Sequence, residues 1–406
     1  MGDALESIYY AAKEHPNCDP YFIPIPYYDR LPNGDIGKQH YEGKENYPDD
    51  IEITYFEDYD IEARRPDAIL NFNPYDGLNK VTSIDPDYYF EKLKEYTDML
   101  IWVPYYVMGD SHGPGVPTSP GVILSNKVIL WADGIKEFFI KLFLEKYENS
   151  GATKEYLEDK FEVLGNPKLD KVLNTKKEYF TIPKEWQNII QDKKIIFFNS
   201  SIALALRYKI YYLKKIRDVM HLIKDNPNVV LWWRPHPLLV TTYESMLPDL
   251  LNAYKSLINE FKVSGSGIYD ETTDLYRAIH YADGYYGGGG TINERSSIQY
   301  MFTARNIPIM EMEKDMSVTK TDQTDINFED FVAEKSSKIE NIEDVFYFES
   351  ENFTLEDFVL FISQYDSIKG IDKLKEKKKE AFSNYYKNSD GTCGKAIVDY
   401  LAKNIK

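Results

Sequence analysis

A run of glycines between a predicted strand and a predicted helix is the strongest local pattern in the sequence. Glycines let backbone N–H groups approach an anion closely, and the N-terminus of a helix adds a favourable dipole. No Gly-Lys-Ser/Thr follows, so the segment is not a P-loop. It favours diphosphate binding; a flexible turn without a ligand is the alternative. The donor-binding residues expected here are Gly287, Gly288, Gly289, Gly290, Thr291, Ser296 and Ser297.

A second polar pair stands at the end of a strongly apolar strand pattern. Residues 232–237 (WWRPHP) place Arg234 and His236 directly after the strand, each followed by a proline. Arginine suits bidentate phosphate recognition, and histidine can donate to a phosphate or transfer a proton near neutral pH. Strand ends deliver side chains to ligands in open α/β sheets, so we expect both residues at the site. A rigid turn in which the histidine caps a carbonyl is the alternative.

A Gly- and Pro-rich loop, residues 107–121, carries an acid and an imidazole two residues apart. Asp110 and His112 follow a predicted strand in this loop. A carboxylate that orients an imidazole makes a competent general base. A tight turn rich in polar residues accounts for the pattern equally well. Together with His236, these two residues are the predicted catalytic group.

Two further strand-end loops, residues 71–76 and 164–170, carry polar side chains in the first half of the chain. Turns of this composition are common, so each loop alone is a weak signal. The residues that we expect at the acceptor side or in the cleft are Asn73, Tyr75, Asp76, Asn166, Lys168 and Asp170.

These loops require a sheet of parallel strands to position them, and the sequence predicts two such sheets. Short apolar runs alternate with helical patterns, which is typical of α/β proteins. Predicted strands of the first half are 21–26, 51–55, 68–72, 99–104, 128–131 and 161–164, with helices at 87–96 and 134–147. After a boundary at 174–192, predicted strands are 194–199, 229–234, 267–269, 284–286 and 307–310. The later helices are 211–224, 243–262, 273–281, most of 355–389, and 394–404.

Two such series in 406 residues predict an α/β fold with two Rossmann-like domains whose parallel sheets face a central cleft. The expected parts are an acceptor-side domain at 1–180, a nucleotide-donor domain at 190–370 and a helical segment at 371–406. We expect the C-terminal helix to cross back to the N-terminal domain. Ligands bind beyond the carboxyl ends of the strands in such sheets, so the cleft is the expected active site.

Composition narrows the possible partners. The net charge of −18 disfavours nucleic acid, because phosphate-backbone binding depends on clustered Lys and Arg. Two cysteines, no signal-peptide pattern and no long apolar run predict a cytoplasmic protein. No metal-binding motif occurs in the sequence. From Lys369 to Lys406 ten lysines face five acids, which predicts either a solvated helix face or peripheral contact with an anionic membrane.

An ordered set of segments resembles the CDP-glycerol glycerophosphotransferase family, whose members polymerise or prime teichoic acids. The segments are most similar to a soluble clostridial branch of this family. The segments span nearly the whole chain, and the ordered set identifies the family more specifically than any single segment does. They are residues 24–30, 65–76, 103–110, 119–123, 164–175, 194–202, 233–238, 281–287 and 390–401.

The resemblance implies a GT-B fold, a CDP-activated polyol phosphate donor such as CDP-glycerol, no cofactor and no obligatory metal. It implies two functional histidines, His236 in the RPHP segment and His112 before a glycine. The segment KIIFFNSSI adds Asn199 and Ser200 to the expected donor site. The family's polymerases read HGTP where this chain reads HGPG. The glycine run before Ser296 is closer to some sugar-nucleotide transferases.

The expected reaction is in-line attack of an acceptor hydroxyl, deprotonated by His112, on the β-phosphorus of a CDP-polyol, with release of CMP. Arg234, His236, the glycine amides and the serine hydroxyls would stabilise the developing charge. The expected acceptor is a glycan or polyol phosphate in cell-surface glycopolymer synthesis. The alternatives are a glycosyltransferase using a UDP-, GDP- or CMP-sugar, a sugar-nucleotide 2-epimerase-like isomerase, and an inactive nucleotide-binding partner.

Overall fold

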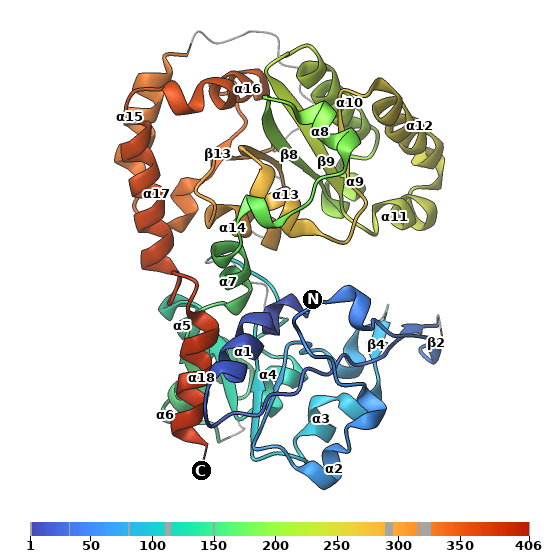
Figure 1. The fold of residues 1–406 in the computed structure, drawn as a ribbon, viewed down its shortest axis with the longest axis vertical. Helices are drawn as coiled ribbons and strands as arrows, with labels where there is room; N and C mark the ends of the chain where they lie inside the picture. Colours follow the sequence, from blue (N-terminus) through green and yellow to red (C-terminus); the bar gives the residue numbers. More distant parts are fainter. Residues whose placement is uncertain are drawn as a thin grey trace. The chain divides into compact units, whose positions relative to one another are not determined.

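The chain forms two compact α/β units in a computed structural model (Figure 1). Unit 1 comprises Met1–Asn174 and Tyr385–Lys406, and unit 2 comprises Thr175–Asn384. The structure describes residues 2–31, 33–79, 82–109, 115–148, 151–288, 295–313, 316 and 326–405.

Unit 2 is built on a six-stranded parallel sheet with the order β10-β9-β8-β11-β12-β13. In chain order this is 3-2-1-4-5-6, the doubly wound Rossmann arrangement. The winding direction reverses between β8 and β11, so the topological switch point lies there. The strands are β8 (Lys194–Ser200), β9 (Val229–Pro235), β10 (Gly267–Tyr269), β11 (Gly284–Gly287), β12 (Ile309–Glu311) and β13 (Tyr347–Phe348).

Helices cover both faces of this sheet, so its strands read as continuous apolar runs (Figure 1). Trp233 packs against Tyr254 and Phe261 of α12, whereas the neighbouring Trp232 contacts Trp186 of α8 on the opposite face. The helices are α8 (Lys184–Ile190), α9 (Ile202–Tyr208), α10 (Ile210–Lys224), α11 (Leu239–Met246), α12 (Pro248–Ser264), α13 (Leu275–Tyr281), α14 (Ser297–Thr303), α15 (Phe328–Lys338), α16 (Leu355–Gln364) and α17 (Ile371–Tyr385), with 3-10 turns η5 (Lys177–Tyr179), η7 (Ile342–Val345) and η8 (Tyr365–Ser367).

One predicted helix of unit 2 is two helices in the structure. The helix expected over 243–262 is divided at Leu247, whose backbone is not helical, and α12 starts at Pro248. Proline lacks a backbone N–H and cannot continue a helix, but it suits the first turn of the next one.

Unit 1 contains a four-stranded parallel sheet, order β3-β5-β6-β7, and a small antiparallel sheet, order β2-β1-β4. The strands are β1 (Tyr27–Arg30), β2 (Ile36–His40), β3 (Ala68–Asn71), β4 (Thr82–Ile84), β5 (Met99–Trp102), β6 (Lys127–Leu130) and β7 (Phe161–Val163). The helices are α1 (Asp3–Glu14), α2 (Ile61–Arg64), α3 (Phe90–Leu93), α4 (Pro120–Leu124), α5 (Asp133–Lys146), α6 (Lys154–Lys160), α7 (Pro167–Asn174) and α18 (Cys393–Asn404), with 3-10 turns η1 (Lys44–Asn46), η2 (Phe56–Asp58), η3 (Asp76–Leu78) and η4 (Pro86–Tyr88).

Two predicted strands of unit 1 are reduced to a single parallel bridge between Phe22 and Ile53. The prediction of strands over 21–26 and 51–55 was therefore wrong in extent. Pro24 and Pro26 lack the N–H that a ladder requires, and regular pairing begins only at Tyr27.

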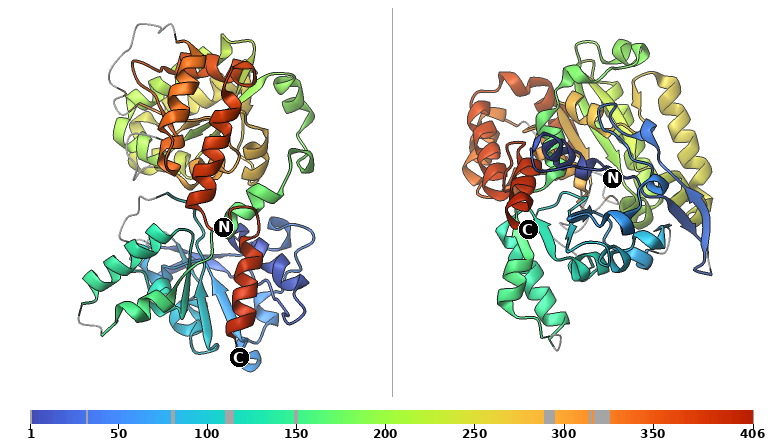
Figure 2. Two further views of the ribbon diagram at one scale, coloured as in Figure 1. Left: turned by 90° about the vertical axis from the view of Figure 1, so that its left-hand side faces the viewer. Right: turned by 60° about the horizontal axis from the view of Figure 1, so that its bottom comes forward.

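The C-terminal helix belongs to unit 1, as the sequence predicted. Helix α18 lies beside α1 (Figures 1 and 2), and its apolar face shares a buried cluster with the parallel sheet. Ile397 and Leu401 of α18 meet Ile8 of α1 and the strand residues Ile101 and Ile129 in this cluster. Burial of such side chains stabilises each by roughly 1.5–3 kcal/mol relative to exposure.

Several lysines of the C-terminal region form ion pairs or hydrogen bonds within the protein. Lys375, Lys377 and Lys395 form ion pairs with Asp366, Glu380 and Asp399 at 3.2, 2.8 and 2.7 Å. Lys378 is buried, and its Nζ donates to the carbonyl of Ile307 at 2.6 Å. Among the described helices, none combines the length and the hydropathy needed to span a membrane.

Candidate functional site

Three segments that are distant in sequence end together at the switch point of unit 2. Asn199 of β8 pairs in register with Arg234 of β9 on one side and with Gly287 of β11 on the other. The N–H of His236 donates to the carbonyl of Ser200 at 2.9 Å, which extends the ladder beyond β9. Parallel strands present their carboxyl ends at one edge, so residues from these three predicted motifs share that edge.

His236 offers a hydrogen-bond donor at this edge. Its Nδ1 accepts from the N–H of Leu238 at 3.2 Å, so the neutral ring carries its proton on Nε2. Nε2 has no partner within the described part of the chain, and the residue is exposed. The surrounding protein partly desolvates the ring and thereby lowers the pKa of His236. The imidazole is therefore neutral at pH values near 7, with its N–H available for an anion.

Arg234 is held by a residue that the sequence analysis missed. Its Nη1 donates to Asp270 Oδ2 at 2.7 Å, and its Nη2 donates to the carbonyl of Thr272 at 2.5 Å. Asp270 is inaccessible to solvent and also accepts from the indole N–H of Trp232 at 3.0 Å. Asp270 follows predicted strand 267–269, so the strand-end reasoning that identified Arg234 applied to it as well.

The two described glycines of the run leave no room for a side chain. A Cβ on Gly287 would lie 2.7 Å from the carbonyl oxygen of Asn199. Gly288 has a φ of +69°, and a Cβ there would lie 2.7 Å from the amide carbon of Gln299. Because only glycine fits, the backbone can follow the neighbouring strand closely and turn outward at the strand end.

Ser296 and Ser297 stand at the start of α14. Ser296 is its N-cap, and the N–H of Ser296 donates to Gln299 Oε1 at 2.9 Å. Gln299 also lies against Gly288, so the beginning of α14 is close to the end of β11. The described part of the glycine run therefore lies close to the N-terminus of α14.

Asn199 and Ser200 have internal partners. Asn199 is buried and donates from Nδ2 to the Tyr285 hydroxyl at 3.3 Å. The hydroxyl of Ser200 is fully buried and accepts from the indole N–H of Trp233 at 3.0 Å. These contacts give the two side chains a structural role at the end of β8.

The predicted residues of the first half fall into two groups that the sheet of unit 1 separates. Asn73, Tyr75 and Asp76 follow β3, whereas the group that begins with Asn166 and Lys168 follows β7. Strands β3 and β7 are the opposite edges of this sheet, with β5 and β6 between them.

The group after β7 is engaged in packing the helices of unit 1. Asn166 is buried and donates from Nδ2 to the carbonyl of Tyr106 at 2.7 Å. The ammonium of Lys168 pairs with Asp3 at 2.7 Å. Asp170 accepts from the N–H of Cys393 at 3.2 Å and from that of Gly394 at 2.7 Å, so it caps α18. The loop predicted at 164–170 is in fact the start of α7.

The group after β3 combines a buried acid with a phenol pair. Asp76 accepts from the N–H of Phe90 at 3.0 Å, and burial raises the pKa of this carboxyl to about 6. The hydroxyls of Tyr75 and Tyr105 are 2.8 Å apart. The side-chain oxygen of Asn73 accepts from the N–H of Tyr75 at 3.2 Å, which shapes the loop.

Several predicted residues lie outside the described residues. They are Asp110, His112, Gly289, Gly290 and Thr291. Within the described ranges, no group of three or more His, Cys, Asp or Glu side chains could hold a metal ion.

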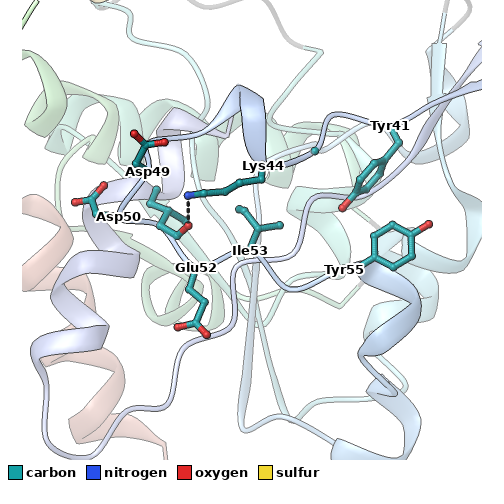
Figure 3. A pocket seen from close by; sticks show the side chains of 9 residues that line it. Tyr41, Lys44, Asp49, Asp50, Glu52, Ile53 and Tyr55 are labelled. Atoms are coloured by element: carbon teal, nitrogen blue, oxygen red, sulfur yellow. Dashed lines mark hydrogen bonds between the residues drawn. The ribbon is translucent and has the colours of Figure 1, made fainter.

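A shallow pocket of about 500 Å³ lies elsewhere in unit 1 (Figure 3). Lys44 extends across it, with Tyr41 and Tyr55 at one end and two aspartates at the other. The ammonium donates to the carbonyl of Ile51 at 2.5 Å, which fixes the surrounding loop. The residues predicted to bind donor or acceptor do not line this pocket.

No family model and no curated protein matches the sequence. Among solved structures, Staphylococcus aureus MnaA with UDP is similar, with a TM-score of 0.53 and 12 % identity over 100 % of this chain and 94 % of that chain. The UDP-GlcNAc 2-epimerase of Methanocaldococcus jannaschii with UDP-GlcNAc and UDP has a TM-score of 0.51 and 12 % identity over 99 % and 97 %. The wall teichoic acid polymerase TagF is more distant, with a TM-score of 0.41 and 14 % identity over 84 % and 73 %.

The first two likenesses cover nearly the whole of each chain and extend over both units. They agree with the two parallel sheets and the Rossmann order of unit 2. The chain has a two-domain Rossmann-like fold of the GT-B type. At 12 % identity the likeness concerns the fold, and membership of the CDP-glycerol family stays a prediction.

Proposed function

We propose that this chain is a transferase that binds a nucleoside-diphosphate donor at the switch point of unit 2 and passes its activated group to a hydroxyl. The observation that supports it best is the position of a hydrogen-bond donor at this edge. The imidazole Nε2–H of His236 lies at the same strand ends as Gly287, Gly288 and the start of α14. The buried carboxylate Asp270 is neutralised by Arg234. Donors at a strand–glycine–helix junction are suited to an anion.

In the proposed reaction the acceptor oxygen forms a bond to the β-phosphorus, and the bond from that phosphorus to the leaving nucleotide oxygen breaks. The acceptor proton passes to a general base, for which His112 stays our prediction. Charge that develops on the departing phosphate is stabilised by the His236 Nε2–H and by backbone N–H groups of the glycine run. Fixed donors of this kind are commonly the largest catalytic contribution in phosphoryl transfer. Asp270 keeps Arg234 at the strand end, where the remaining N–H groups of the guanidinium supplement these donors.

The transferred group that we propose is a polyol phosphate carried by CDP, as in CDP-glycerol, with CMP as the leaving nucleotide. The ordered segments that resemble the glycerophosphotransferase family support this choice. The acceptor would be a glycan or a polyol phosphate of a cell-surface polymer. In unit 1, the paired hydroxyls of Tyr75 and Tyr105 after β3 and β5 are suited to polyhydroxylated ligands.

A sugar nucleotide is the second candidate donor. The glycine run that begins at the end of β11 resembles some sugar-nucleotide transferases more than the glycerophosphotransferase family. Two proteins of similar fold were solved with UDP bound, one of them also with UDP-GlcNAc. The same edge would then serve glycosyl transfer or 2-epimerisation.

The released product distinguishes these candidates. The purified chain would be incubated with CDP-glycerol, CDP-ribitol, UDP-sugars or GDP-sugars, with and without glycan acceptors. Release of CMP supports polyol phosphate transfer, UDP or GDP indicates glycosyl transfer, and an isomerised donor without acceptor indicates an epimerase. Thermal shift identifies the donor beforehand, since a ligand at a hundred times its Kd stabilises the native state by about 2.7 kcal/mol. Absence of both stabilisation and turnover with every donor would refute the proposal.

A further inference from the structure

We propose that Gln299 is a positioning residue that connects the described glycines at the end of β11, Gly287 and Gly288, with the start of α14, and that Glu311 and Arg295 hold it in place. This inference rests on the proposed function, because the glycine run is where the donor diphosphate is proposed to bind.

The amide of Gln299 lies against the end of β11 and against the start of α14. Gln299 is fully buried in the first turn of α14. Its Oε1 accepts from the N–H of Ser296 at 2.9 Å, on the C-terminal side. On the N-terminal side, the amide fills the space that a side chain at Gly288 would need. One side chain therefore connects the end of β11 with the beginning of α14.

Glu311 connects this amide to the sheet. It is the last residue of β12, pairs in register with Gly287, and is only 2 % exposed. Its carboxylate accepts from Gln299 Nε2 at 3.1 Å and forms an ion pair with the Nε of Arg295. Arg295 directly precedes Ser296, the N-cap of α14, so β12 is connected both to the end of β11 and to the start of α14.

Arg295 is fixed on its other side as well. Its guanidinium lies 4.2 Å from the ring centroid of Phe346 and pairs with Glu343. The hydroxyl of Tyr300 donates to the same Glu343 carboxylate at 3.1 Å. The buried guanidinium therefore has an ion-pair partner on each side, and removing Arg295 would leave the buried Glu311 carboxylate without its cation.

These contacts order the flanks before any ligand arrives. Backbone donors can bind a diphosphate tightly only if little conformational entropy remains to be lost on binding. A buried glutamine is costly unless its amide is satisfied, and here both ends have partners. Through these buried hydrogen bonds, Gln299 holds the neighbouring backbone N–H groups in a fixed geometry.

The test compares the wild-type protein with Gln299→Met, which keeps the length of the side chain but loses both hydrogen bonds. Calorimetry with CDP and UDP should show about tenfold weaker binding of whichever nucleotide the wild type binds. Amides of residues 287–288 and 295–299 should exchange about tenfold faster even without nucleotide. The matched control is Thr303→Val, which removes a buried hydroxyl bond elsewhere in α14. It should leave both readouts at wild-type values.

Equal nucleotide affinity and equal exchange in the wild type and Gln299→Met would overturn the inference. So would an equal response to Thr303→Val, because it would show general destabilisation of the helix. If the wild type binds neither nucleotide, a CDP or UDP donor is refuted, and the proposed function then depends on the GDP-sugars of the donor screen. The exchange comparison still decides in that case whether Gln299 fixes the flanks.

Discussion

The carboxyl strand ends of the two units differ in what their polar residues do. In unit 1, Asn166 and Asp170 follow a strand but are buried and bonded to backbone groups of their own unit. In unit 2, His236 follows a strand, uses one ring nitrogen internally and leaves the other without a partner in the described structure. A position directly after a strand places a side chain at the carboxyl edge of the sheet. The hydrogen-bond partners of that side chain decide whether it is available to bind a ligand.

Two buried aspartates make the contrast clear. Asp170 accepts from two N–H groups at the start of α18 and thereby attaches the C-terminal helix to unit 1. Asp270 accepts from Arg234 and from Trp232 and thereby orients a cation at the switch point. The residue type and the strand-end position are the same, yet one carboxylate stabilises a helix and the other prepares a site.

The largest effect is expected for Asp270→Ala. The variant leaves the guanidinium of Arg234 without its buried partner, and breaking such a pair costs about 3–5 kcal/mol. Urea denaturation should show this loss in the free energy of unfolding. Asp270→Asn retains an acceptor for Trp232 and should lose less. A loss below about 1 kcal/mol in the alanine variant would mean that the pair is effectively solvated.

His236→Ala should reduce nucleotide release about 10²–10³-fold, since it removes one fixed donor to the leaving phosphate. The side chain is exposed, so thermal stability should stay close to that of the wild type. His221→Ala is the matched control, because His221 is an exposed histidine of unit 2 that contacts Glu260. Full turnover in His236→Ala would remove this residue from the proposed site.

Asp76→Asn should change how the stability of unit 1 depends on pH. Burial raises the pKa of Asp76 from its ordinary 3.8 to about 6, so the folded state retains a proton that the unfolded chain has lost. The free energy of unfolding of the wild type should therefore fall by up to about 3 kcal/mol as pH rises from about 4 to 6. Asparagine cannot ionise and tolerates the φ of +46° at this position.

The stability difference between Asp76→Asn and the wild type should grow in favour of the variant from pH 4 to pH 7. Denaturation midpoints across this range provide the measurement. Parallel pH profiles would show that Asp76 is solvated in the folded protein.

The smallest effect is expected for Asp170→Ala, about 1 kcal/mol, which is typical for loss of a helix cap. Hydrogen exchange should become faster in α18 (Cys393–Asn404) and stay constant in unit 2. Unchanged exchange in α18 would show that its apolar contacts with α1 are enough to hold the helix in place. Faster exchange at the switch point would contradict the separation of roles between the units.

The apolar strands of both sheets could be predicted because they are buried on both faces. Runs such as KIIFFN and VVLWW are continuous, and the structure confirms them as β8 and β9. The antiparallel strands β1, β2 and β4 were missed, since their partly exposed residues show no clear pattern. Helix α7 was mistaken for a turn because Gly165 and Pro167 resemble turn residues.

The partners of the site residues could not be predicted from local patterns. Asp270 reaches Arg234 because β10 lies beside β9, and Glu311 reaches Arg295 because β12 lies beside β11. Strand order is a tertiary property, so the sequence indicates which residues stand at strand ends but not which of them meet. The sequence pattern therefore identified residues at strand ends but not their partners Asp270, Gln299 and Glu311.

Hydrogen exchange of the intact protein with and without CDP or UDP tests whether the donor binds at the switch point of unit 2. We expect protection in peptides that cover residues 199–204, 234–238, 287–288 and 295–299. Residues 166–170 and the pocket around Lys44 should exchange as in the free protein. Protection of that pocket alone, or no protection at the carboxyl ends of β8, β9 and β11, would contradict a donor site at the switch point.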